Sequence, residues 1–353
     1  MTQKQFLGCE FAEKRQKWLE MANPYLTPSL KGVEPKVRGS LPYKSCRLCP
    51  RSCGVDRTAG EKGYCEETAE LRVAAALLHC GEEPPLVGTT GSGTIFVSGC
   101  SLRCVFCQNY QISQGDAAAQ AMGKPVSTEE FAAICIALQN KGAENINIVT
   151  GSHAIPAIVQ GVIAARKAGM KIPLLWNCSA YENTSALEML RDHVDVYLPD
   201  LKTMDSEIAE KFFNAPDYPA TAAAAIIKMM DMSREKVIVR HLILPDYLES
   251  THRVLRWFAD NAKDRALLSL MTQYTPIPGR QQTAPNRFVS EKDYKTVLGW
   301  LEEFNIEEGF CQELVTGSDW LPDFLRPNPF SSELSVPVWH FATQFPAHFT
   351  SRT

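Results

Sequence analysis

Three cysteines near residue 100 carry the clearest chemistry in the chain. Cys100, Cys104 and Cys107 follow one another at C-x3-C-x2-C spacing, directly after an apolar run at residues 94–98. Because most iron–sulfur cubanes take four thiolate ligands, one on each iron, three thiolates leave one iron without a protein ligand. An open coordination position is what a metal needs to bind and activate a substrate. The spacing favours a reactive iron–sulfur cluster, and the alternatives are a zinc knuckle or three unrelated buried thiols.

A second cysteine group precedes the first one. Its members are Cys46, Cys49, Cys53 and Cys65, and the glycines at 54, 60 and 63 allow the tight turns of a loop around a metal. Four thiolates close a tetrahedral zinc site or ligate an iron–sulfur cluster, and thiolate ligands suit both metals. We predict a second metal site that is structural or electron-transferring, with zinc and iron–sulfur left open. The alternative is a reduced cysteine-rich turn in which only two or three ligands are engaged.

Short apolar runs that alternate with amphipathic segments must position these cysteines. We expect strands at residues 95–97, 146–149, 172–176, 194–198, 237–244 and 267–271, and helices at 128–140, 155–167, 184–193, 220–230, 253–262 and 291–304. Repeated β–α units of this kind build a parallel sheet. No G-x-G-x-x-G opens a helix after the first strand, so a dinucleotide-binding fold is disfavoured. The pattern predicts an α/β fold, a barrel or partial barrel of about six units.

Polar residues follow the expected strands at their carboxyl ends. They lie at residues 150–153, 177–181 and 199–202, at Arg240 and His241, and at Gln273 and Tyr274. Asp200 and Lys202 are two residues apart and point to the same face, which a buried strand tolerates only if they are paired or used. We predict that this set lines a pocket, with an internal ion pair at the barrel end as the alternative. His153 and His241 could assist proton transfer or could be hydrogen-bonded structural residues.

The first cysteine motif, with Phe106 before its last cysteine, resembles the signature of radical S-adenosylmethionine (SAM) enzymes. Residues 102–109, Leu-Arg-Cys-Val-Phe-Cys-Gln-Asn, are further similar to proteins related to pyruvate formate-lyase activating enzymes. The resemblance implies a [4Fe–4S] cluster on Cys100, Cys104 and Cys107, whose fourth iron binds the amino and carboxylate groups of SAM. It implies reductive cleavage of SAM to a 5′-deoxyadenosyl radical and a partial (βα)6 barrel.

The same resemblance assigns roles to several strand-end residues. Asp200-Leu201-Lys202 is similar to the Asp-Leu-Lys run near the cofactor and substrate of the activating enzymes, and Arg240 resembles the arginine of their fifth strand. These three are the expected catalytic residues. Asn177 and Ser179 fall where those enzymes carry an Asp-Thr-Asn-Gly run, and they are expected to bind the cofactor.

The chain departs from the family pattern at two places. The second strand should end in a Gly-Gly-Glu-Pro-like motif, but this sequence has Thr150-Gly151-Ser152-His153. Only Gly151 and Ser152 are therefore candidates to contact the amino group of SAM. At the sixth strand Tyr274 stands in place of the family's histidine and is a further candidate for cofactor binding.

The resemblance also implies partners. A low-potential donor such as ferredoxin or flavodoxin would reduce the cluster. The hydrogen donor would be a glycine of a partner protein, as in glycyl-radical activation, or another peptide or small molecule. The competing hypothesis is a non-catalytic iron–sulfur or zinc protein, an electron carrier or scaffold, which explains the cysteines but not the polar strand ends.

Composition narrows the class of protein. The chain has 353 residues, 45% of them apolar, and a formal net charge of −4 with dispersed lysines and arginines. We therefore expect no nucleic-acid partner. Residues 1–20 do not resemble a signal peptide and no run has the length of a membrane span, so we expect no membrane partner and a cytoplasmic location. Twelve cysteines in such a chain favour metal binding over disulfides.

We expect four segments along the chain. Residues 1–44 form a helix over 11–21 and a Pro/Gly-rich arm, residues 45–90 the cysteine-rich metal-binding segment, and residues 91–305 the barrel. Residues 306–353, rich in proline and aromatic residues, form an irregular C-terminal arm that packs on the barrel or binds a partner.

Overall fold

Parallel strands form the framework of the molecule. The computed structural model describes residues 41–233, 237–279 and 282–345, so the expected helix over 11–21 lies outside the described residues. The first set of parallel strands pairs in the order β2 (Ser92–Val97), β4 (Ile146–Val149), β5 (Leu174–Cys178) and β6 (Val196–Pro199). The parallel series continues with β7 (Val237–Leu242), β8 (Ala266–Met271) and β9 (Gly309–Cys311). A parallel bridge between Asp200 and Arg240 joins the two sets. The predicted α/β fold with a partial (βα)6 barrel is confirmed, and β9 extends it by one strand.

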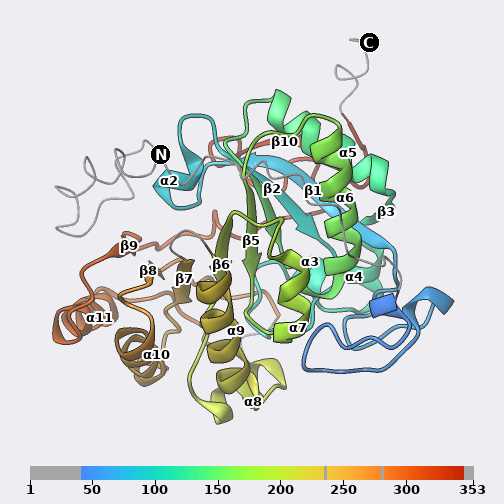
Figure 1. Ribbon diagram of the computed structural model, residues 1–353. Helices are drawn as coiled ribbons and strands as arrows, with labels where there is room; N and C mark the ends of the chain where they lie inside the picture. The colour runs from blue at the N-terminus through green and yellow to red at the C-terminus, as the bar shows by residue number, and fades with distance from the viewer. Residues whose placement is uncertain (1–40, 234–236, 280–281, 346–353) are drawn as a thin grey trace.

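Helices connect the successive strands and cover the outer side of the curved sheet (Figure 1). They are α5 (Thr128–Asn140), α6 (Ile155–Lys167), α7 (Thr184–Leu187) with the turn η7 (Glu188–Leu190), α8 (Ser206–Phe213), α9 (Tyr218–Met232), α10 (Leu248–Asn261) and α11 (Glu291–Glu303). Local sequence fixes two of their starts. The Ser127 hydroxyl accepts a hydrogen bond from the Glu130 amide, and Ser290 and Asp293 form a capping box.

The strand 146–149 and the helices 128–140 and 155–167 agree with their predicted bounds. These two helices pack tightly, because a Cβ at Gly161 in α6 would overlap the Phe131 ring in α5. The predicted helix 184–193 is shorter and ends in the turn η7, and α8 was not expected.

The sheet extends beyond the segment expected to form the barrel. Strand β1 (Leu71–His79) pairs antiparallel with β2, and β10 (Ser335–His340) pairs antiparallel with β1. The small strand β3 (Lys124–Val126) also pairs with β1, and short helices α2 (Pro84–Val87), α3 (Tyr110–Ser113) and α4 (Ala117–Ala121) lie in the connections. The expectation of a wholly irregular C-terminal arm is therefore wrong. Sequence reasoning missed β1 because the strand is buried on both faces and shows no alternation.

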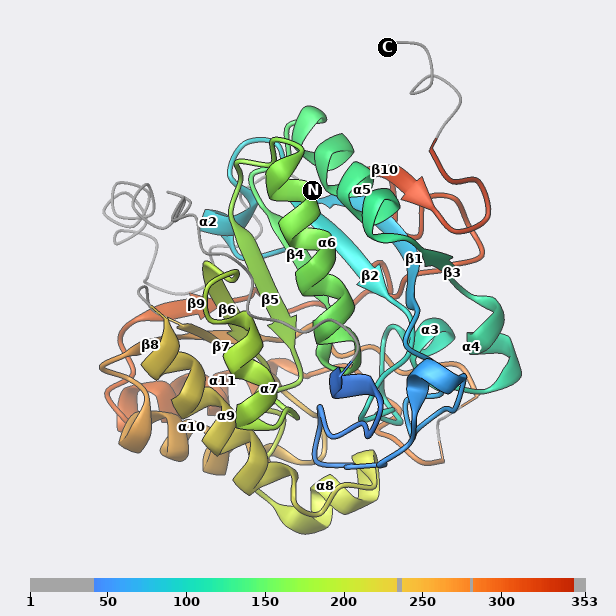
Figure 2. The same cartoon turned by 45° about the vertical axis from the view of Figure 1, so that its right-hand side comes forward.

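The cysteine-rich segment lies beyond the carboxyl ends of the parallel strands, next to α7 and α8 (Figure 2). Hydrogen bonds fix it there. The Asn183 side-chain amide donates to the Arg47 carbonyl at 2.7 Å, and the Arg57 guanidinium donates to the His153 carbonyl. The segment includes the 3-10 turns η4 (Leu41–Tyr43) and η5 (Arg57–Ala59). Among the described residues, no helix has the length and apolar character to cross a membrane.

Candidate active site

The loop after β2 carries the first cysteine group. Two residues in the left-handed region, Gly99 (φ 84°) and Arg103 (φ 54°), turn the chain so that the loop folds back on itself. Phe106 anchors the loop, because it is buried and its ring lies edge-on to Phe212 and Phe213 at centroid distances of 5.6 and 5.7 Å. An aromatic residue before the last cysteine therefore has a packing role.

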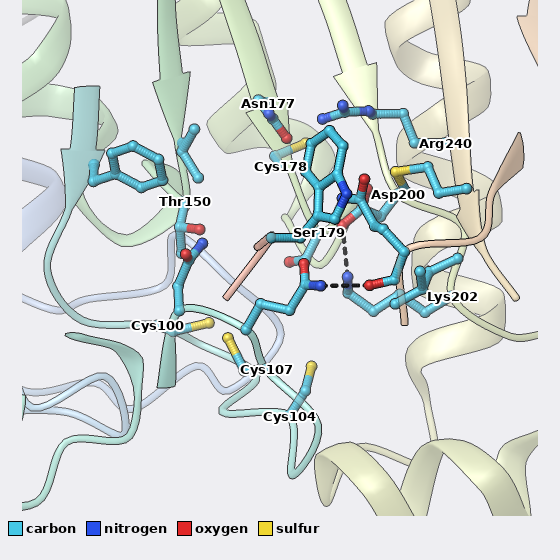
Figure 3. A pocket seen from close by; sticks show the side chains of 18 of the residues that line it. Cys100, Cys104, Cys107, Thr150, Asn177, Cys178, Ser179, Asp200, Lys202 and Arg240 are labelled. Carbon is cyan, nitrogen blue, oxygen red and sulfur yellow. Dashed lines mark hydrogen bonds and ion pairs between the residues drawn. The ribbon is translucent and has the colours of Figure 1, made fainter. Parts of the chain in front are cut away.

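The three cysteines line one cavity of about 210 Å³. Figure 3 shows the sulfur atoms of Cys100, Cys104 and Cys107 gathered at its edge. The Leu102 amide donates to the Cys100 sulfur at 3.4 Å, and the Ser113 hydroxyl donates to the Cys107 sulfur at 3.3 Å. Hydrogen bonds to sulfur are one of the means by which a protein sets the potential of an iron–sulfur cluster.

An ion pair faces the cysteines from the end of β6. The Lys202 ammonium lies 2.6 Å from the Asp200 carboxylate, and both side chains line the cavity. Burial opposes the charge of Lys202, but Asp200 and then Cys104 favour the ammonium and raise its pKa. The Tyr218 hydroxyl fixes the turn by accepting from the Lys202 amide at 3.0 Å. Lys202 therefore stays charged beside Cys104.

A second charged group lies on the cavity wall next to Asp200. The Arg240 guanidinium pairs with Glu82 at 2.7 Å and with Glu83 at 2.9 Å, and both carboxylates are buried. Burial opposes the charge of Arg240, but Glu83 and Glu82 outweigh it and raise the pKa. The Asn147 amide donates to Glu82 at 3.0 Å. Arg240 is thus fixed in position by two carboxylates.

The structure brings most of the predicted strand-end residues together. Asn177, Ser179, Asp200, Lys202 and Arg240 line the cavity with the three cysteines (Figure 3). Thr150, in the left-handed region at φ 64°, lines the cavity at the end of β4.

Three candidate cofactor-binding residues lie outside the cavity lining. The Ser152 hydroxyl is buried and donates to Glu182 at 2.7 Å, while Gly151 packs against Trp176, whose ring a Cβ there would overlap. The Tyr274 hydroxyl donates to the Pro285 carbonyl at 2.8 Å. These side chains face the interior of the protein and support the fold around the cavity.

The two histidines are also outside the cavity lining. His153 lies 2.8 Å from the Ser98 carbonyl, and His241 bridges the Leu201 carbonyl and the Thr251 hydroxyl at 2.7 and 3.0 Å. Burial, the largest cause for each, lowers the pKa of His153 to about 3 and that of His241 to about 4. Both stay neutral near pH 7, as the structural alternative expects.

Sequence reasoning missed several residues that line the cavity, among them His79, Glu82, Gln108 and Trp320. Glu82 follows β1, whose last residue pairs with the first residue of β2, so it enters from the end of the barrel opposite to the cysteines. Glu82 could therefore not be predicted from the rule that functional residues follow the carboxyl ends of parallel strands. Trp320 comes from the C-terminal arm, which the Gln111 side chain ties to α3 through Asp323 and Phe324.

The second cysteine group does not line this cavity. Cys46 and Cys65 are buried, Cys49 is half-buried and Cys53 is exposed. Burial is the largest cause that raises the pKa of Cys49 to about 12; a hydrogen bond from the Arg51 backbone opposes it, and the charges of Cys65, Cys46 and Cys53 add to it.

Three thiols at the edge of one cavity are a donor set that suits an iron–sulfur cluster. No group of three or more His, Cys, Asp or Glu side chains within the described residues is arranged to hold one metal ion. A cubane does not need such convergence, because each thiolate binds a different iron. The three thiols at the cavity edge, with polar and charged groups beyond them, match a cluster that shares one iron with a ligand.

The chain is similar in sequence to known proteins. Residues 94–258 match the family described as the Radical SAM superfamily. An uncharacterized protein of Methanocaldococcus jannaschii is 29% identical over 286 residues, which cover 80% of this chain and 81% of that one.

Two solved structures resemble part of this chain. The Streptococcus suis protein SuiB bound to the precursor peptide SuiA is 14% identical with a TM-score of 0.47, and the match covers 61% of this chain and 46% of that one. A radical SAM methyltransferase from Sphaerobacter thermophilus is 14% identical with a TM-score of 0.48, over 63% of this chain and 66% of that one.

Proposed function

Residues 94–258 form a radical SAM domain, and from this premise we propose that the protein removes a hydrogen atom from a substrate held at the Asp200–Lys202–Arg240 wall of the cavity. The family implies an enzyme that uses a [4Fe–4S] cluster and SAM. When bound, these groups supply a 5′-deoxyadenosyl radical. The observation that carries the proposal is that the three motif cysteines and the charged strand ends line one cavity.

We assign the cluster to Cys100, Cys104 and Cys107. Asn177, Ser179 and the neighbouring Thr150 present polar groups to the same space and would orient the amino and carboxylate groups of SAM. Lys202 holds positive charge beside Cys104, and Arg240 is kept in place by Glu82 and Glu83.

Aromatic residues close the remaining walls. Phe96, Phe106, Trp320 and Phe330 line the cavity and limit the access of water to the reacting groups. Trp320 packs on Gly81, where a Cβ would overlap the indole. The protein's contribution is therefore orientation, fixed charge and exclusion of solvent.

The resemblance to pyruvate formate-lyase activating enzymes supports a glycine of a partner protein as the hydrogen donor. The electron enters from a low-potential carrier of the ferredoxin or flavodoxin class. Both assignments rest on family analogy.

Anaerobic reconstitution with iron and sulfide, followed by reductant and SAM, tests the reaction. We expect 5′-deoxyadenosine from the parent protein and none from Cys104→Ala. The matched control is Cys135→Ala, which removes a fully buried thiol in α5, and it should keep the product. A parent protein with a full cluster and no 5′-deoxyadenosine would support the non-catalytic carrier instead.

Trapping a partner tests the substrate. The reconstituted protein, with SAM and reductant, would be mixed anaerobically with candidate glycine-containing proteins, and the glycyl radical would be sought by electron paramagnetic resonance. Product formation only with small molecules would contradict the choice of a protein substrate while leaving SAM cleavage intact.

A further inference from the structure

The loop that carries the second cysteine group is held in a defined shape by its own backbone. The Cys46 amide donates to the Val55 carbonyl and the Gly54 amide donates back to the Cys46 carbonyl, both at 3.0 Å. The Ser52 amide donates to the Cys49 carbonyl at 3.0 Å, and Gly54 takes a left-handed φ of 69°. The Tyr64 amide donates to the Cys53 sulfur at 3.3 Å. The cysteines are thus presented together by an ordered loop, and the described cysteines form no disulfide.

A buried arginine lies against these thiols. Arg57 is 1% exposed, and its Nη1 lies 3.9 Å from the Cys46 sulfur. Its Nε donates to the Glu67 carbonyl at 3.0 Å, and its other donors reach the carbonyls of His153 and Thr68. No carboxylate of the described residues forms an ion pair with it.

Among the described residues, the Arg57 guanidinium has carbonyls, the Cys46 thiol and the Tyr43 ring as partners, but no carboxylate pairs with it. Burying a charge without a counter-charge is costly. Protonated thiols would not balance it. Thiolates bound to a metal carry net negative charge at the place where Arg57 points. The buried charge of Arg57 is therefore balanced when the cysteines ligate a metal, and it is not balanced when the thiols are free.

The loop also contacts the first cysteine loop. The Arg51 guanidinium donates to the Ser101 carbonyl at 3.0 Å and to the Phe213 carbonyl at 2.8 Å, and it stacks on Tyr64 at 3.9 Å from the ring centroid. Ser101 is adjacent to Cys100. A metal that orders the second loop would therefore also order the first.

We propose that Cys46, Cys49, Cys53 and Cys65 bind a second iron–sulfur cluster, with Arg57 as its counter-charge. Within the part of the chain that the structure describes, the four thiols do not converge on one ion, and an iron–sulfur cluster does not require this because each thiolate binds a different iron. The four thiolates leave no iron open, so this cluster takes no substrate. It supports the first loop through Arg51.

Metal content of a variant without the first site tests the proposal. The full chain carrying Cys100→Ala, Cys104→Ala and Cys107→Ala would be reconstituted anaerobically, and iron, sulfide and zinc would be measured with Mössbauer spectra. We expect about four iron and four sulfide per chain, as for one cubane. Adding Cys49→Ala and Cys53→Ala should remove them, whereas adding Cys135→Ala should not.

Other outcomes overturn the proposal at different levels. One zinc per chain in place of iron would overturn the iron–sulfur assignment, and no metal would overturn the site itself. Since this variant cannot cleave SAM under the proposed function, its metal content is independent of whether that function is correct.

The role of Arg57 has its own test. In the same background, Arg57→Met should lose iron to a chelator at least about tenfold faster, because the unbalanced cluster charge favours release. Arg57→Lys, which keeps the charge, should lose iron more slowly than the Met variant even if both are less stable. Arg47→Met, an exposed arginine of the same loop, is the control. Equal iron loss from the Met, Lys and parent proteins would refute the counter-charge.

Discussion

The two cysteine groups sit beside different counter-charges. The first opens on a cavity whose walls carry Lys202 with Asp200, and Arg240 with Glu82 and Glu83. The second faces one buried arginine, Arg57, whose described partners are carbonyls and a thiol. Charges that are already paired hold their positions whether or not a cofactor is present, which suits a site that binds and releases ligands. Under our proposal, thiolates bound to a metal balance the charge of Arg57.

The largest expected effect tests the paired charges beside the first cysteine group. Arg240→Met leaves two buried carboxylates without a cation and should lower the free energy of unfolding by about 3–5 kcal/mol near neutral pH. Urea unfolding of the reconstituted protein measures it. Adding Glu83→Gln should recover part of the loss, and the surface pair variant Arg253→Met should cost about 0–1 kcal/mol. An equal loss in the two single variants would show that Arg240 is not a buried structural cation.

Lys202→Met tests whether the charge beside Cys104 assists SAM cleavage. A charged hydrogen bond contributes about 1.5–3 kcal/mol, so 5′-deoxyadenosine should form about 10- to 100-fold more slowly at full cluster occupancy. Lys211→Met, which removes an exposed lysine that bonds Tyr247, is the control. Full activity of the Lys202 variant would assign this residue to the fold alone.

Acid should weaken the barrel beneath the first site. The pKa of His241 is lowered to about 4 by burial, so the unfolded chain binds its proton first as the pH falls. Stability from this group is present above about pH 6.5 and falls toward pH 4, by about 1 kcal/mol between pH 7.5 and pH 5.5. Urea unfolding at the two pH values should show a smaller change in His241→Asn than in the parent, with His252→Asn as the control. An unchanged difference would contradict the buried, neutral state.

The smallest expected effect concerns the hydrogen bonds to the cysteine sulfur atoms, which differ between the two groups. The Ser113 hydroxyl donates to the Cys107 sulfur in the first group, whereas in the second group the Cys53 sulfur accepts from the Tyr64 backbone amide. Ser113→Ala should lower the potential of the first cluster by about 20–60 mV, the one-electron equivalent of a hydrogen bond of about 0.5–1.5 kcal/mol. A spectroelectrochemical titration measures it. A shift of equal size in the second cluster would show that the two groups are not separate.

Much of the site could be predicted from sequence because its residues follow parallel strands. Asn177, Ser179, Asp200, Lys202 and Arg240 come from separate β–α units, yet the rule that carboxyl ends of parallel strands meet at one edge places them together. Gly151, Ser152 and Tyr274 are near those same ends but face the interior. Spacing gives the position along a strand or loop but not the direction in which an irregular segment turns.

The sequence by itself determined the spacing of the two cysteine groups, the β–α order and the acidic–basic pair that follows β6, since each depends on residues close together in the chain. Only the tertiary structure decided the partners of Arg240 and Arg57, and the place of Trp320 in the cavity wall. Arg240 and Glu82 are about 160 positions apart in the chain, Arg57 and His153 about 100, and Trp320 and Gly81 about 240. Local periodicity carries no information over such separations, because the contact depends on how distant elements pack. The antiparallel strand β1 brings Glu82 in from the far end of the barrel, and for this reason the carboxylate partner of Arg240 could not be predicted from the sequence.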